Sequence, residues 1–454
     1  MIATRIAKSL GLTPDQFVRA SPFFVVYLLL FTALTIADAV SVSLFASRIG
    51  ADRLPAWYSA TAVLSLVMMA WYLTRATRVA AEAIFRQILV AVAVLFLVAW
   101  ATFHYRGGAV PLGMLFVTRE VAVTLILMHF GTFLQDFFVR AELNRILPII
   151  YAGGRVGGIV GGGLVGSLAT RLGTVNLVPL VVALIAVAAI GIVVIARRIE
   201  RRDEEPDPPQ VSPSPSPLAV SPSPPTEMAT TATAGDAGFP AWRPASKRWI
   251  VAVSQFLIQV RTVPLLGWLT VTTLFFVGCR WFLAYQYTSF FEHHFADDVA
   301  MASFLGRYTQ IALLISLGLQ LFVVNRLVDR FGVATTHFAY SLLVLAGLGG
   351  NWLLPGLPLA IAGRFLESEL RFGLRNPVNQ MLVNRFPKRM RIVVRGWSLG
   401  WLIPIGTLTA SAMLGILLAI GAGPAVAIVG CLLGIGFVVS AYRVGRAYNQ
   451  YEPH

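Results

Sequence analysis

The chain has 454 residues, of which 57% are hydrophobic and only 13% are charged, and its mean hydropathy is +0.74. A soluble protein is nearer half apolar and about a quarter charged, so this composition excludes an ordinary water-soluble fold and indicates a protein of the lipid bilayer. The formal net charge of +15 would favour nucleic-acid binding in a soluble chain. Here the basic residues flank apolar segments, which favours a role in orienting the chain in a membrane over any nucleic-acid partner.

Twelve apolar segments are long enough to cross a bilayer, since about 20 residues at about 1.5 Å each span a hydrocarbon core of about 30 Å. The predicted spans are 22–47, 54–74, 85–103, 109–135, 148–170, 175–196, 263–290, 302–325, 333–354, 356–381, 395–420 and 423–444. The expected fold class is therefore an all-α polytopic membrane protein. The sequence contains no zinc-protease motif, nucleophile elbow or phosphate loop, so neither an enzyme nor a bound cofactor or metal is expected.

Three ionisable residues in predicted spans of the first half are candidates for a site. Asp38 is near the middle of the first span, and Arg119 and Glu120 are adjacent in the fourth. An ionisable side chain at the centre of a bilayer costs about 2.5–3.5 kcal/mol on insertion scales, so such residues face the bundle interior, pair with one another or serve a function. We expect these three residues in a substrate-binding or coupling site.

The fifth span contains a glycine repeat, YAGGRVGGIVGGGLVG at 151–166. Three of its glycines have the spacing G-x-G-x-x-G of a dinucleotide loop, but that motif needs a preceding strand, and this repeat lies inside a segment long enough to span. Glycine at every fourth position makes a smooth ridge on a helix, which lets a neighbouring backbone approach closely. We interpret the following residues as such a helix-packing seam: Gly154, Gly158, Gly162 and Gly166.

A segment rich in proline, serine and threonine separates the sixth and seventh spans. It occupies 199–246, and its composition cannot form a packed core. We interpret it as a disordered cytoplasmic linker between an N-terminal six-helix bundle, 1–198, and a C-terminal bundle, 247–454. Basic residues gather beside this linker and in alternate loops, while the loop at 291–298 is acidic. By the positive-inside rule, both termini and the linker are cytoplasmic.

The second half also carries charge inside its spans. Arg280 lies in the seventh span, and the tenth contains GRFLESELRFGLRNP at 363–377. Polar residues of this tenth span recur at three- and four-residue steps and so line one helix face; they are Arg364, Glu367, Ser368, Arg371 and Arg375. The stripe fits either internal ion pairing or a wall of a translocation path, and its excess of arginine favours a wall that holds an anion. Pro377 is expected to end or bend the helix.

Two six-helix halves, a long central loop and the sequence NRLVDRFG at 325–332 together resemble the major facilitator superfamily. The resemblance implies two bundles that rock about a central site, and a cytoplasmic gate braced by Asp329 and Arg330. The segment NRILPIIYAGGRVGGIVGGGLVG at 144–166 resembles the ATP/ADP translocase (nucleotide transporter) branch, in which an Arg-x-x-Pro sequence leads into a glycine-rich fifth helix.

In that superfamily helices one, four, seven and ten line the central cavity. The resemblance therefore implies one chamber shared by Asp38, Glu120, Arg280 and Glu367, with a salt bridge from Asp38 to Arg280 linking the halves. The sequence predicts a secondary active transporter of the bacterial inner membrane that moves a small anionic or phosphorylated, nucleotide-like solute by alternating access, with protons as a candidate coupling ion. The alternative is a non-transporting membrane scaffold or sensor with the same fold.

Overall fold

The computed structural model describes residues 13–76, 78–138, 140–199 and 260–451. Throughout these ranges the regular structure is helical, with no β-strand, and eleven helices are long and apolar enough to cross a membrane. The expected all-α, polytopic fold class is therefore confirmed. The predicted linker, 199–246, lies outside the described residues except for its first residue.

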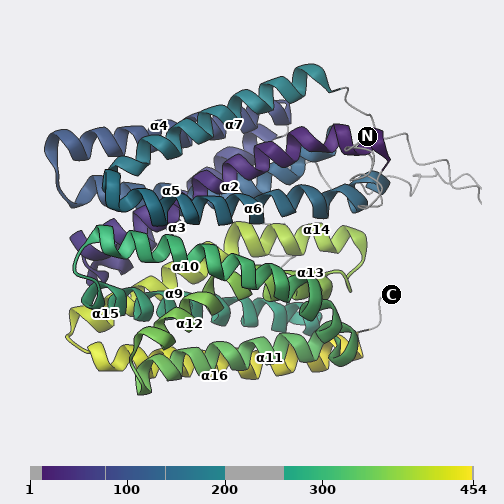
Figure 1. Ribbon diagram of the computed structural model, residues 1–454. Helices are drawn as coiled ribbons and strands as arrows, with labels where there is room; N and C mark the ends of the chain where they lie inside the picture. Colours follow the sequence, from purple (N-terminus) through teal and green to yellow (C-terminus); the bar gives the residue numbers. More distant parts are fainter. Residues whose placement is uncertain (1–12, 77, 139, 200–259, 452–454) are drawn as a thin grey trace, which may run out of the picture.

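The first half is built from long helices that lie together on one side of the molecule (Figure 1). These helices are α2 (Pro14–Arg48), α3 (Leu54–Ala76), α4 (Ala81–Arg106), α5 (Ala109–Gln135), α6 (Arg140–Leu172) and α7 (Val178–Arg198). Helix α2 begins at a capping box: Thr13 Oγ1 accepts a hydrogen bond from the Gln16 N–H, and the Gln16 side chain accepts one from the Thr13 N–H. Each of the first six predicted spans overlaps one of these helices.

The second half occupies the other side of the molecule (Figure 1). Its helices are α9 (Pro264–His294), α10 (Asp298–Gly318), α11 (Asn325–Leu353), α12 (Leu357–Glu367), α13 (Asn376–Val383), α14 (Lys388–Trp397), α15 (Ile403–Ala419) and α16 (Gly423–Gln450). The first and last described residues lie at the same end of the molecule, here called the terminal end (Figure 1). The opposite end, where α2 ends, is called the far end.

The predicted tenth span, 356–381, is not one regular helix. Helix α12 ends at Glu367, and a wider π-helical turn, η4 (Arg371–Arg375), connects it to α13. The reason is Pro377, which has no N–H and whose ring would clash with the carbonyl of Gly373 in a regular α-helix. A π turn gives that carbonyl more room. The regular α-helix is therefore interrupted just before Pro377.

The predicted eleventh span is widened in the same way. A π-helical turn, η5 (Ser398–Leu402), joins α14 to α15. Pro404 follows it, so that Gly400, four residues earlier, lies inside the wide turn. A third π turn, η3 (Leu319–Val324), joins α10 to α11 without a proline.

One face of the glycine repeat of α6 packs against α2 in the same half. A Cβ atom at Gly161 would lie 2.7 Å from the carbonyl oxygen of Thr32, and one at Gly157 would overlap the backbone of Leu28. At Gly154 an added Cβ would come within 2.6 Å of the Tyr27 ring. Contacts shorter than about 3 Å leave no space for a side chain, so these glycines allow the two helices to touch.

The other face of the repeat packs against α10 and so joins the two halves. A Cβ atom at Gly162 would lie 2.6 Å from the carbonyl oxygen of Gly306 and 2.9 Å from the backbone nitrogen of Gln310. At Gly166 it would lie 2.9 Å from Cγ of Arg307, and at Gly158 it would overlap a methyl group of Leu313. The predicted seam is therefore split between α2, at Gly154, and α10 of the opposite half.

Candidate functional site

A cavity of about 750 Å³ lies between the two halves. Helices α2, α3, α5 and α6 line it from the first half, and α9, α10, α12 and the turn η4 line it from the second. The volume is within the range of pockets that hold small molecules, roughly 300–1,000 Å³. Its ionisable lining residues are Asp38, Arg119, Glu120, Arg155, Arg280, Glu367, Glu369, Arg364 and Arg371.

Asp38 stands between two arginines from different halves of the protein. Its Oδ2 accepts a hydrogen bond of 2.6 Å from Nη2 of Arg364, which comes from α12, and its Oδ1 lies 3.1 Å from Nη2 of Arg119, which comes from α5. Arg364 is buried, with 5% of its surface exposed. A buried arginine without an acidic partner would be strongly destabilising, so Asp38 is what allows Arg364 to occupy this position.

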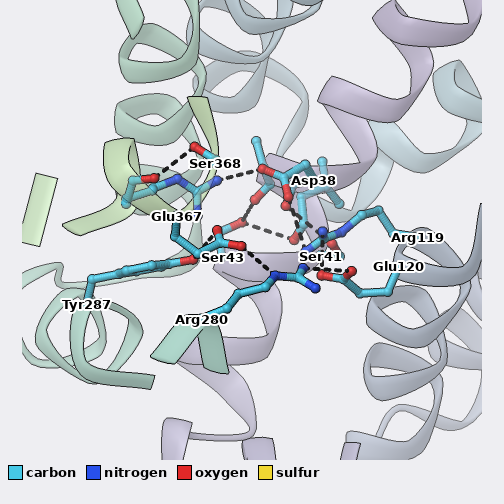
Figure 2. A network of polar contacts seen from close by, with 12 residues as sticks. Asp38, Ser41, Ser43, Arg119, Glu120, Arg280, Tyr287, Glu367 and Ser368 are labelled. Carbon is cyan, nitrogen blue, oxygen red and sulfur yellow. Dashed lines mark hydrogen bonds and ion pairs between the residues drawn. The ribbon is translucent and has the colours of Figure 1, made fainter. Parts of the chain in front are cut away.

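Alternating charges continue from Arg119 and Glu120 across the interface to Arg280 of α9 and Glu367 of α12 (Figure 2). Arg119 donates to Glu120 at 2.7 Å, and the other oxygen of Glu120 accepts from Arg280 of α9 at 3.4 Å. Nε of Arg280 in turn donates to Glu367 at 2.7 Å, and Arg371 lies 3.5 Å from the same carboxylate oxygen. We call this alternating set of seven residues, from Arg364 to Arg371, the ion chain.

The ion chain carries a formal charge of +1, because it contains four arginines and three carboxylates. Arg371 is at its end and shares the Glu367 oxygen with Arg280 at the longer of the two distances. Its Nε atom is buried without a hydrogen-bond partner. Arg371 also lines the cavity, so it is the cation of the chain that is best placed to receive a further anion.

Two other polar contacts border the ion chain. The hydroxyl of Tyr287 donates to Oε2 of Glu367 at 3.3 Å (Figure 2). A separate pair joins the halves nearer the terminal end, where Nη1 of Arg155 on α6 lies 3.2 Å from Oε2 of Glu369 and Nη2 lies 3.5 Å from Gln320. The Arg155–Glu369 pair has no net formal charge and leaves the balance of the cavity unchanged.

The two halves make further contacts at the far end. Arg48, at the end of α2, pairs with Asp298, at the start of α10, at 2.9 Å. Glu292 accepts a hydrogen bond of 2.7 Å from the backbone N–H of Ala51, and the hydroxyls of Ser59 on α3 and Ser411 on α15 are 2.6 Å apart. From the layer of the ion chain, the cavity lining continues away from these contacts to Leu147, Leu317 and Phe372. The cavity is therefore closed toward the far end.

Seven of the eight residues predicted for the site line this cavity. The exception is Arg375, whose guanidinium lies 3.6 Å from the centre of the Phe276 ring and which is not a lining residue. The π turn η4 contains both Arg371 and Arg375, and its wider spiral turns Arg375 away from the face that a regular helix would give it. The expectation that Arg375 belongs to the wall is wrong.

The expected salt bridge between Asp38 and Arg280 is also wrong. Both residues line the cavity, but Asp38 is paired with Arg364 and Arg119, while Arg280 is paired with Glu120 and Glu367. Each carboxylate is occupied by guanidinium groups that approach from other helices.

Two charged lining residues were not predicted as site residues, Arg155 and Glu369. Arg155 is the one charged residue within 149–168, and that isolation was the signal that marked it. The residues expected at a gate, Asp329 and Arg330, are exposed on α11, just before a kink at Gly332, where φ is 81°. They lie outside the cavity lining, and their gating role stays a prediction.

No family's sequence profile matches this chain, and no curated protein matches it. Solved structures do share its shape. A mutant of the nucleoside transporter NupG has a TM-score of 0.64 at 9% identity over 94% of this chain and 99% of its own. A bacterial homologue of the iron transporter ferroportin gives 0.61 at 10% identity over 94% and 98%. The xylose transporter XylE from E. coli gives 0.54 at 12% identity over 94% and 95%. The chain therefore shares the overall fold of these transporters.

Proposed function

We propose that the protein is a secondary active transporter that moves a small organic anion across the membrane by alternating access. The observation that supports this most directly is the cavity between the halves, which is closed at the far end and crossed by an ion chain to which both halves contribute. Charged side chains within a membrane protein commonly mark a substrate or ion pathway. The structural neighbours include transporters of nucleosides and of xylose, which supports transport as the activity without indicating this protein's solute.

The ion chain suggests how solute binding and movement of the halves are linked. Two of its contacts cross the interface, Asp38–Arg364 and Glu120–Arg280. If the halves rock apart at this level, both contacts break, and a bare arginine in a low-dielectric site is costly. An anion bound at Arg371 competes with Glu367 and so loosens the hold of Glu367 on Arg280. In this proposal the solute replaces carboxylate partners during the change of state.

We propose the bacterial inner membrane as the location, with both termini cytoplasmic. The basic residues beside the linker and in alternate loops support this orientation, and it places the far end, where the cavity is closed, on the periplasmic side. Protons are proposed as the coupling ion, taken up by Asp38, Glu120 or Glu367 when their arginine partners leave. The nucleotide preference of the ATP/ADP translocase branch is not part of the proposal, since that branch depends on lysines in the membrane and the three lysines here lie outside the predicted spans.

Charge reversal across one interface contact tests the proposal. Asp38→Arg or Arg364→Asp alone places like charges together, and each should abolish uptake of labelled anions into proteoliposomes. The double variant Asp38→Arg/Arg364→Asp restores opposite charges and should recover a measurable part of the uptake. The control is the same swap at Asp52 and Arg53, an exposed pair 3.5 Å apart, which should leave uptake unchanged.

Two results would count against the proposal. Absence of both uptake and binding for every anion of a broad panel would contradict transport. Failure of the double variant to recover any uptake, while it is still folded and inserted, would contradict the role of the Asp38–Arg364 contact.

A further inference from the structure

The cavity holds little net charge for its size, and this limits the number of negative charges that a bound solute can carry. The ion chain has a formal charge of +1, and the remaining pair, Arg155–Glu369, is neutral. Arg375, which would have added another positive charge, lies against Phe276 instead. A solute with several negative charges would therefore enter with most of them uncompensated, at a high cost in a low-dielectric site. A single negative charge matches the excess.

The wall nearer the terminal end is aromatic on the side of the first half. The rings of Tyr27 and Phe31 are 4.6 Å apart between centroids, and those of Tyr27 and Tyr151 are 5.1 Å apart. All three line the cavity. Gly154 makes this arrangement possible, because any larger residue would collide with the Tyr27 ring. We call Tyr27, Phe31 and Tyr151 the aromatic wall.

Apolar side chains of the second half complete this part of the cavity. Leu313, Leu317 and Phe372 line it, and Leu127 and Leu147 extend the lining beside the aromatic wall. A strongly hydrated solute such as a sugar phosphate would gain nothing from these surfaces and would lose water to them. A planar or bulky apolar group would gain both from burial and from ring contacts.

From these two observations we infer that the solute is an amphiphile with a single negative charge and a bulky apolar, ring-bearing body. Its anionic group lies at Arg371, in the layer of the ion chain, and its body lies between the aromatic wall and the leucines of α10. This inference rests on the proposed transport function and narrows its substrate class. It favours a hydrophobic carboxylate or sulfate monoester, which carries one negative charge, over a nucleotide or a sugar phosphate.

A matched set of ligands tests the inference on the full chain in lipid nanodiscs, with empty nanodiscs subtracted. Pyrenebutyrate has one charge and a ring body, butyrate has the same charge without the ring, pyrenebutyramide has the ring without the charge, and pyrenetetrasulfonate has the ring with several charges. We expect pyrenebutyrate to bind at least about tenfold more tightly than each of the other three. Equal or tighter binding of pyrenetetrasulfonate, of butyrate or of ATP would overturn the inference.

Variants of the two parts of the cavity separate their contributions. Tyr151→Ala should weaken pyrenebutyrate about tenfold and leave butyrate unchanged, whereas Arg371→Gln should weaken pyrenebutyrate and leave the neutral amide unchanged. The control is Tyr442→Ala, an exposed tyrosine on α16. If Tyr151→Ala does not fold, Phe31→Leu serves as the second variant. Unchanged affinity for pyrenebutyrate in a folded aromatic-wall variant would overturn the inference.

Uptake measurements distinguish failure of this inference from failure of the proposed function. If proteoliposomes accumulate ATP or butyrate and the Asp38–Arg364 swap affects that uptake, transport stands and the amphiphilic substrate class is wrong. If pyrenebutyrate binds as expected but none of the ligands crosses the membrane, the substrate class stands as a binding property and the transport proposal is wrong.

Discussion

The contact between Gly162 and α10 makes a sharp prediction about the balance between conformational states. An added methyl group in Gly162→Ala would lie 2.6 Å from the Gly306 oxygen and 2.9 Å from the Gln310 nitrogen. Both are backbone atoms, so neither can move aside without shifting α10. Overpacking of this kind typically costs about 1–3 kcal/mol. Because α6 and α10 belong to different halves, the cost falls mainly on the state closed at the far end, whose population should fall relative to the open state about 5- to 150-fold.

Cross-linking across the far end measures this population. The hydroxyls of Ser59 and Ser411 are 2.6 Å apart, so cysteines at both positions should form a disulfide readily in the closed state. The native cysteines, Cys279 and Cys431, are replaced by alanine in this background. Gly162→Ala should slow disulfide formation by the factor by which the closed population falls.

Two control substitutions separate this effect from general destabilisation. Gly318→Ala, at the end of α10, adds a methyl group where no heavy atom lies within 4 Å, and it should leave cross-linking unchanged. Gly157→Ala overlaps the Leu28 backbone inside the first half, so it should lower the melting temperature without changing cross-linking of the folded fraction. Cross-linking in Gly162→Ala at the rate of the Gly318→Ala control would refute the reasoning.

Three further outcomes are expected. Pro377→Ala permits a regular helix through η4 and so moves Arg371, and it should lower anion uptake at least about tenfold while the protein still folds; Pro264→Ala, at the first residue of α9, should leave uptake unchanged. Arg48→Gln removes an ion pair in which Arg48 is half-exposed and Asp298 is buried. Because water reaches Arg48, the pair is worth about 1 kcal/mol, so Ser59–Ser411 cross-linking should slow by about fivefold at most, and a larger decrease would show that this pair dominates closure. Deletion of 205–240 should leave uptake unchanged, since a transporter needs only a tether there, and loss of uptake in an inserted protein would favour the scaffold alternative.

The helices and most of the cavity-lining charges could be predicted from the sequence, because both depend on the free energy of placing each single residue in lipid. Lipid tolerates long apolar segments and penalises charge, so Asp38, Glu120, Arg280 and Glu367 stood out within their spans and were expected to turn inward. All four line the cavity. That argument counts each residue separately and needs no knowledge of its neighbours.

The pairing within the site could not be predicted in the same way. Which guanidinium reaches which carboxylate depends on the relative height and rotation of several helices, and spacing along one helix does not contain that information. Arg375 shows the difficulty most clearly, because its placement depends on the π turn before Pro377, which shifts the helical register within a few residues. Arg155 is an isolated charge in its predicted span, but its partner Glu369 lies outside the polar stripe predicted for the tenth span.

If the two halves separate, the formal charge of the ion chain is divided unequally between them. The first half retains Asp38, Arg119 and Glu120, with a formal charge of −1, and the second retains Arg280, Arg364, Arg371 and Glu367, with a formal charge of +2. An anion is therefore favoured on the second half, where it lowers the charge to +1.

The first half then keeps two carboxylates, Asp38 and Glu120, whose one remaining partner is Arg119. A proton is the smallest ion that can neutralise the remaining charge of −1 without filling the cavity. This unequal distribution of charge is the electrostatic argument for coupling anion transport to proton transport. In the proposed mechanism, the anion would stabilise one half and a proton the other, so the halves would separate at least cost in free energy when both are bound.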